Sequence, residues 1–158
     1  MDKGGQRTKP AVVVDASVAV KWIVPGEPSH IQATTLGEWI ASGRVQALAP
    51  PLLLYEVASV LLKAASVGVL GIEDGTRAVD ALGQLGLDIA TMTWSDLAEI
   101  LSMASATGLT AYDSAYLHLS KRMGAPLVTA DESLKRKGEK VTDVILLQEL
   151  DASDLAEG

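Results

Sequence analysis

Cysteine is absent from this chain of 158 residues, so it has no disulfide framework and no thiolate for metal binding or catalysis. No apolar run approaches the length of a membrane span, and no apolar signal segment follows the charged stretch of residues 1–10. These absences predict a soluble protein of the reducing cytoplasm that does not contact a membrane.

Basic residues are also scarce. Lysine and arginine together number 13, against 20 aspartates and glutamates, which gives a net charge of −7. Proteins that wrap nucleic acid broadly neutralise many phosphates with basic side chains, so that mode of binding is disfavoured. An enzyme acting on nucleic acid remains compatible with this charge, because bound cations can neutralise its acids locally.

Apolar residues make up 48% of the chain, enough to bury the core of one domain. Short apolar runs alternate with segments of helical spacing. The apolar runs predict strands at 11–14, 46–49, 87–92, 126–129 and 144–147. The helical spacing predicts helices at 29–42, after Pro51, and at 72–85, 95–106 and 110–123. This alternation indicates an α/β fold with a central parallel sheet covered by helices on both faces. We expect a single domain over residues 11–150, between a flexible leader (1–10) and an acidic tail (151–158).

Four acidic residues each interrupt an apolar neighbourhood, namely Asp15, Glu56, Asp113 and Asp131. Asp15 and Asp131 lie just past predicted strands, and ligands of parallel sheets bind beyond the carboxyl ends of the strands. Each acid also has a simpler explanation. Asp15 or Asp131 can cap a following helix, Asp113 can form a helix start with Thr110, and Glu56 can be an exposed acid near a helix N-terminus.

If the four carboxylates converge, their repulsion is large, since two unit charges 4 Å apart cost about 4 kcal/mol at an effective dielectric of 20. Binding divalent cations relieves that repulsion, and oxygen-only ligands favour Mg²⁺ or Mn²⁺ over zinc. Two such ions can activate water and stabilise the leaving oxygen in phosphodiester cleavage. Ser17 and Thr129 stand beside the acids and can orient ligands or water, although local turn bonding explains them equally well.

Four segments carry a resemblance to a known family. They read VVVDASVAVKW (12–22), APPLLLYEVASVL (49–61), GLTAYDSAYL (108–117) and LVTADESL (127–134). In this order and spacing they resemble the PIN-domain nucleases, and within them the VapC-type toxin ribonucleases. The resemblance extends from about Val12 to Leu147.

This resemblance implies a three-layer PIN-like fold and cleavage of RNA that depends on Mg²⁺ or Mn²⁺. It implies that the four acids are the metal ligands and the catalytic residues, in a type II toxin that pairs with a VapB-like antitoxin and often forms a homodimer. Ser59 is a departure, because related sequences commonly place asparagine three residues after the glutamate. Its shorter side chain can still hydrogen-bond a ligand or water.

Other functions compete with this prediction. A phosphatase with Asp15 as nucleophile would require a second acid two residues later, where Ser17 stands. Glycine-rich phosphate loops are absent, which disfavours nucleotide binding. A catalytically silent PIN-like scaffold that binds RNA or protein, and a DNA-cutting PIN nuclease, remain the alternatives.

The remaining polar and aromatic residues have less specific interpretations. His30 and His118 show no zinc-binding spacing, and we expect both to lie on a surface or a helix face. An outward-facing position is the commoner one for a helical lysine such as Lys21. Tyr112 and Tyr116 flank Asp113, and we expect them to pack or to form a dimer contact rather than stack on bases.

Overall fold

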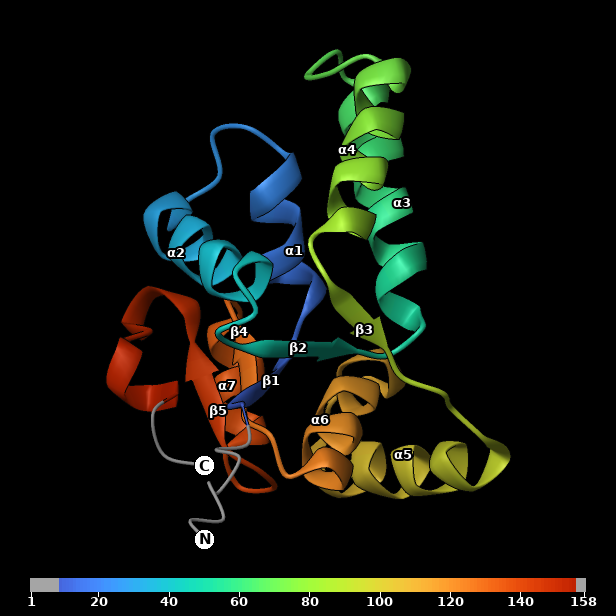
Figure 1. Cartoon of the computed structure of the whole chain (residues 1–158). Coiled ribbons are helices and arrows are strands. Elements are labelled where there is room, and N and C mark those ends of the chain that lie inside the picture. The colour runs from blue at the N-terminus through green and yellow to red at the C-terminus, as the bar shows by residue number, and fades with distance from the viewer. Residues whose placement is uncertain (1–8, 156–158) are drawn as a thin grey trace, which may run out of the picture.

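The computed structural model describes residues 9–155 and contains a parallel sheet of five strands (Figure 1). The strands are β1 (Ala11–Val14), β2 (Gln46–Ala49), β3 (Leu87–Ile89), β4 (Leu127–Thr129) and β5 (Val144–Leu146), in the spatial order β3-β2-β1-β4-β5. Every neighbouring pair is parallel, as in the register Val13 opposite both Leu48 and Leu127. The predicted parallel α/β sheet is confirmed.

Helices connect all the strands. They are α1 (Ala16–Ile23), α2 (His30–Ala41), α3 (Leu52–Ser66), α4 (Ile72–Gln84), α5 (Trp94–Thr107), α6 (Ala111–Met123) and α7 (Glu132–Gly138), followed by short 3₁₀ turns at Leu147–Glu149 and Ala152–Leu155. The predicted helices lie within one residue of these bounds. The sequence pattern did not delimit α1 and α7 as elements, and β3 ends three residues earlier than predicted.

The strand order places a topological switch point between β1 and β4. From β1 the chain proceeds outward to β2 and β3, then crosses back to β4 on the other side of β1. Connections leave the carboxyl ends of β1 and β4 in opposite directions, so a crevice opens there. Asp15 directly follows β1, and one residue separates Asp131 from the end of β4, which brings both to this edge of the sheet.

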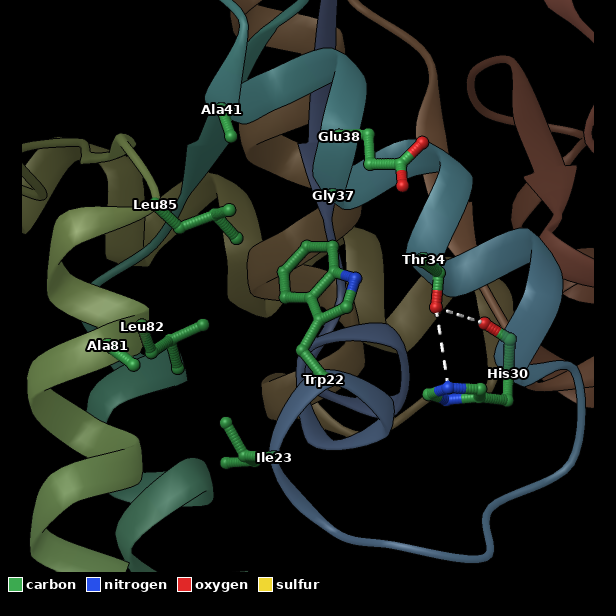
Figure 2. Close-up of a pocket in the computed structure, with 10 residues that line it drawn as sticks. All are labelled: Trp22, Ile23, His30, Thr34, Gly37, Glu38, Ala41, Ala81, Leu82 and Leu85. Atoms are coloured by element: carbon green, nitrogen blue, oxygen red, sulfur yellow. Dashed lines mark hydrogen bonds between the residues drawn. The ribbon is translucent and has the colours of Figure 1, made fainter.

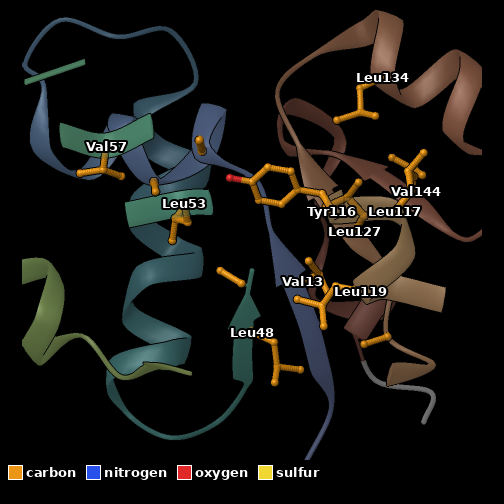
Figure 3. Close-up of a cluster of buried hydrophobic side chains, with 14 of the residues drawn as sticks. Val13, Leu48, Leu53, Val57, Tyr116, Leu117, Leu119, Leu127, Leu134 and Val144 are labelled. Carbon is orange, nitrogen blue, oxygen red and sulfur yellow. The ribbon is translucent and has the colours of Figure 1, made fainter. Parts of the chain in front are cut away.

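The core occupies both faces of the sheet because alternate residues of β1 point to opposite sides. Val13 joins one apolar cluster with Leu53 of α3 and Leu117 of α6 (Figure 3). Val12 and Val14 join a second cluster with residues of α2. A strand buried on both faces needs an unbroken apolar run, which residues 11–14 provide.

Helices α3 and α4 run side by side and extend away from the sheet as a pair (Figure 1). Gly68, at φ 76°, lies between them in the left-handed region that glycine tolerates best. Leu54 and Leu62 of α3 are more than half exposed, so this pair presents an apolar surface.

The predicted leader and tail fall partly outside the described residues, and their boundaries stay a prediction. Leu155 is buried in the second core cluster. Across residues 9–155, no helix is both long enough and apolar enough to cross a bilayer.

A buried polar network joins α5 to α6. His118 is 3% exposed, and its Nε2 lies 2.7 Å from Oδ1 of Asp96, while its Nδ1 lies 3.5 Å from Oε2 of Glu99. Arg122 donates to Asp96 at 2.7 Å. His118 lies on a helix face as predicted, but the predicted surface position is wrong, because α5 packs over that face of α6.

We expect Asp96→Asn to remove a stabilisation that depends on pH. The hydrogen bonds from His118, Thr93 and Arg122 hold the pKa of Asp96 well below its usual value. A lowered folded-state pKa contributes stability that is fully present above the unfolded pKa, about 3.9, and is lost as pH falls through the folded value. The wild-type protein should therefore have a Tm several degrees above that of Asp96→Asn at pH 5, and this difference should narrow below about pH 4.

Asp80→Asn, at an exposed position of α4, is the control and should leave Tm unchanged. A gap that stays constant between pH 5 and pH 3 would contradict this account.

Candidate metal centre

Asp15 is the most deeply buried acid of the predicted set, at 6% exposure. Its carboxylate oxygen Oδ2 accepts hydrogen bonds from the hydroxyls of Ser17 and Thr129, each at 2.7 Å. Its side chain makes no capping bond to α1, so the capping explanation for Asp15 is wrong. Two hydroxyls therefore fix the orientation of this buried carboxyl group at the end of the central strand.

Ser17 and Thr129 also tie the ends of β1 and β4 together. The Ser17 hydroxyl accepts the backbone N–H of Ala130 at 2.9 Å, and the Thr129 hydroxyl accepts that of Asp131 at 3.1 Å. Only the Thr129 bond to Asp131 is local, whereas the Ser17 bond to Ala130 spans 113 positions of the chain. The predicted role of these hydroxyls in orienting metal ligands or water stays a prediction. Through these bonds the Asp15 carboxylate is coupled to the backbone that follows β4.

Glu56 lies in the second turn of α3 and is partly buried. Its Oε1 accepts a hydrogen bond at 3.0 Å from the hydroxyl of Tyr116, which belongs to α6. Glu56 is therefore not an exposed acid held only by the helix dipole, and that simpler explanation is wrong.

Asp113 lies in the first turn of α6 and is partly buried. Its backbone N–H donates to the Thr110 hydroxyl at 3.0 Å, so Thr110 caps the helix as predicted. The cap uses the backbone of Asp113. Its carboxylate lies close enough to Asp15 and Glu56 for its charge to act on both.

Asp131 differs from the other three acids because its side chain is exposed. Oδ1 accepts the backbone N–H groups of Ser133 and Leu134, at 2.7 and 3.1 Å. The capping explanation is correct for this residue. Its second oxygen is not part of the cap and remains available at the edge of the crevice.

Electrostatic coupling shows which acids lie together. Burial raises the pKa of Asp15 and of Glu56 above their usual values. The negative charge of Asp113 raises both pKa values further, and that of Asp15 adds to the effect on Glu56. These three carboxylates therefore form one repulsive cluster.

Asp131 belongs to the cluster only through Asp113. Burial raises the pKa of Asp113, and the charge of Asp131 raises it further, while Lys137 of α7 acts in the opposite direction. The Lys137 ammonium donates to the carbonyl of Gly108 at 3.2 Å, which places it beside the segment that leads into α6. A positive charge thus stands at the edge of the crevice occupied by Asp113 and Asp131.

The donor set suits a hard divalent cation. The side chains that meet here offer carboxylate and hydroxyl oxygens, which are the ligands that Mg²⁺ and Mn²⁺ prefer. Within residues 9–155, however, no three acidic or histidine side chains are already arranged closely enough to hold an ion. A cation bound here would have to draw the carboxylates closer together.

A groove of 740 Å³ opens directly beside the cluster. Glu56 and Ser17 line it, together with Ser59, whose side chain is exposed. Tyr55 and Tyr112 also line it, and these two tyrosines are 74% and 67% exposed. Tyr112 is therefore not packed into the core, the dimer contact predicted as its other role stays a prediction, and its ring is accessible from the groove.

A separate pocket of 380 Å³ lies between α1, α2 and α4 (Figure 2). The ring of Trp22 stands at its centre and donates from its indole nitrogen to the carbonyl of Ala33 at 2.6 Å. None of the four predicted acids lines this pocket. Lys21, the neighbour of Trp22, is only 7% exposed and pairs with Glu27 at 3.5 Å, so the expectation of an outward-facing lysine is wrong.

Tyr116 is the residue at this site that sequence reasoning interpreted too narrowly. It is packed in the core as expected, at 1% exposure, but its hydroxyl reaches Glu56. Burial raises the pKa of this hydroxyl, and the charges of Glu56 and Asp15 raise it further, so it remains a donor. The spacing of three residues between Asp113 and Tyr116 was a usable signal, since it places both on one side of a helix.

The site therefore combines a five-stranded parallel sheet with acidic side chains gathered at its switch point. The family model for the PIN domain matches residues 12–140, and the chain belongs to the PIN-domain family. It is 31% identical over 127 residues to Ribonuclease VapC3 of Pyrobaculum aerophilum, covering 80% of this chain and 93% of that protein. This similarity places it among the VapC-type members.

Solved structures show the same fold. The crystal structure of PAE2754 from Pyrobaculum aerophilum has a TM-score of 0.66 and 24% identity, covering 89% of this chain and 93% of the other. A toxin–antitoxin complex from Klebsiella pneumoniae contains a chain with a TM-score of 0.60 and 16% identity, covering 88% of this chain and 99% of the other. At these identities the likeness concerns the arrangement of helices and strands.

Proposed function

We propose that this protein is an endoribonuclease that depends on Mg²⁺ or Mn²⁺ and is the toxin of a type II toxin–antitoxin pair. The observation that carries the proposal is the coupled cluster of Asp15, Glu56 and Asp113 at the switch point of the sheet. Membership of the PIN-domain family and the similarity to Ribonuclease VapC3 support it.

The proposed ligands are the carboxylates of Asp15, Glu56 and Asp113, with Asp131 at the margin of the site. A bound divalent cation would supply an activated water and neutralise charge that develops on the scissile phosphate. Asp15 is suited to anchor the site, because two hydroxyl bonds fix its orientation at the end of β1. Asp131 has one oxygen committed to the α7 cap, which suits it to an outer role.

The groove of 740 Å³ suits the substrate because it leads directly to Glu56. The exposed rings of Tyr55 and Tyr112 offer faces on which unpaired bases can stack. Lys137 is placed to attract phosphate toward Asp113. This local arrangement compensates for the net charge of −7, which disfavours broad electrostatic binding.

We propose the α3–α4 pair as the surface for an antitoxin or a second copy of the chain. Leu54, Leu62 and Val79 are exposed there, and an apolar hollow of 230 Å³ lies between the two helices. Exposed apolar surfaces of this kind mark interaction sites. The toxin–antitoxin complex among the structural neighbours supports an antitoxin as one occupant.

The test of the proposed activity is cleavage of labelled RNA and of sequence-matched single-stranded DNA by the purified protein. We expect RNA to be cut in Mg²⁺ or Mn²⁺ and to stay intact when a chelator is added. Cleavage of DNA alone would favour a DNA-cutting nuclease of the same family. No cleavage of varied RNAs under any metal condition would favour a silent scaffold.

A further inference from the structure

Tyr116 connects the two helices that supply acids from outside the central strand. It lies on α6, three residues after Asp113, and its hydroxyl donates at 3.0 Å to Oε1 of Glu56 on α3. Glu56 and Tyr116 are 60 positions apart in the chain. The hydrogen bond therefore joins two segments that meet only in the folded protein.

The ring of Tyr116 is fixed by packing. The residue is 1% exposed and belongs to the apolar cluster that contains Leu53 and Leu117. Figure 3 shows the ring within this cluster, with its hydroxyl directed toward the side on which α3 lies. A tyrosine has only two side-chain torsions, so a packed ring places its hydroxyl at one point.

The Glu56 carboxylate needs such a fixed partner. It ends a flexible side chain on the wall of the groove, and the charges of Asp15 and Asp113 favour turning it away. The Tyr116 hydroxyl holds Oε1 and leaves Oε2 free to face a cation. A hydrogen bond to one oxygen of a ligating carboxylate both orients the ligand and lowers the cost of bringing it into the cluster.

We propose that Tyr116 is a positioning residue that orients Glu56 for divalent-metal binding. This inference rests on the proposed function, because it requires the acid cluster to bind a cation. A positioning role differs from an ordinary packing role in one respect. Removing the Tyr116 hydroxyl should weaken metal binding only when the Glu56 carboxylate is present.

The experiment is a double-mutant cycle with Mn²⁺ affinity as the readout, measured by isothermal titration on the full chain without RNA. Tyr116→Phe keeps the ring and removes only the hydroxyl, and we expect it to weaken Mn²⁺ binding by about 10-fold. In the Glu56→Gln background, adding Tyr116→Phe should change the affinity by less than about 2-fold, since the carboxylate is already gone.

Tyr112→Phe is the matched control. It removes a hydroxyl four residues earlier on the same helix, at a position that is 67% exposed. The variant keeps the ring proposed to stack on bases and the titration contains no RNA, so Mn²⁺ affinity should stay unchanged. Circular dichroism and Tm without metal establish that every variant is folded before titration.

The outcomes separate this inference from the proposed function. Mn²⁺ binding by the wild type that Tyr116→Phe leaves unchanged would overturn the positioning role alone. Equal weakening in the wild-type and Glu56→Gln backgrounds would do the same, because it would show a general packing effect. Absence of Mn²⁺ binding in the wild type would overturn the proposed function and this inference with it.

Discussion

Asp15→Asn and Asp113→Asn are each expected to reduce metal-dependent RNA cleavage by at least about 100-fold while the protein stays folded. Both substitutions preserve the shape of the side chain and remove its negative charge. A divalent cation would lose a charged ligand in a cluster that otherwise draws it in. The measurement is single-turnover cleavage of a labelled RNA in Mn²⁺, with circular dichroism as the check on folding.

The structure gives reasons to expect these variants to fold. The Asp15 carboxylate is buried at a cost, and asparagine avoids that cost while Ser17 and Thr129 can rotate their hydroxyls to suit an amide. Asp113→Asn removes a charge that raises the pKa of its neighbours, which relieves repulsion. In chelator, both variants should therefore melt at or above the wild-type Tm.

Asp143→Asn is the matched control for cleavage. Asp143 is an exposed acid that immediately precedes β5, at the opposite edge of the same sheet. The Asp143→Asn variant should cut RNA at the wild-type rate. Full activity in Asp15→Asn or Asp113→Asn would remove the acid cluster from the proposed mechanism.

Mn²⁺ is expected to raise the Tm of the wild-type protein by about 5–10 °C when its concentration reaches 100 times the Kd. Binding to the folded state alone contributes about 2.7 kcal/mol at that ratio. For a chain of this size each kcal/mol corresponds to roughly 2–4 °C. The cation also relieves the repulsion among Asp15, Glu56 and Asp113, which exists only in the folded protein, so binding stabilises the folded state.

Differential scanning calorimetry with and without chelator provides the measurement. Asp113→Asn should lose most of the Mn²⁺-dependent rise in Tm, and Asp143→Asn should keep it. A rise of equal size in Asp113→Asn would place the stabilising ion elsewhere on the protein. No rise in the wild type would favour the silent scaffold.

The acids of the site show which features local sequence pattern can predict and which it cannot. Asp15 was found because an apolar run of four residues ends at a charge, and the parallel sheet places that charge at a crevice. The same pattern suggested that Asp131 could cap a helix, which is correct, and that Asp15 could do so, which is wrong. Pattern alone does not separate the two, because the difference depends on what each carboxylate meets across the sheet.

Residues whose partners lie on a different segment of the fold were the ones misjudged. Lys21 is buried against the loop that carries Glu27, and His118 is buried because α5 packs over α6. A helical periodicity shows that a residue lies on a particular face, but it does not show which element covers that face. Polar side chains are buried only where such an element brings a hydrogen-bonding partner.

Local periodicity and the ends of apolar runs were sufficient to predict the parallel α/β sheet, five of the seven helices in residues 9–155 and the four candidate acids, because these depend on spacing along the chain. Tertiary packing alone made Asp131 peripheral to the coupled acids and placed the Tyr116 hydroxyl against Glu56. Contacts between residues 60 positions apart depend on how α3 and α6 pack on the sheet, and that packing leaves no periodic signal in either segment.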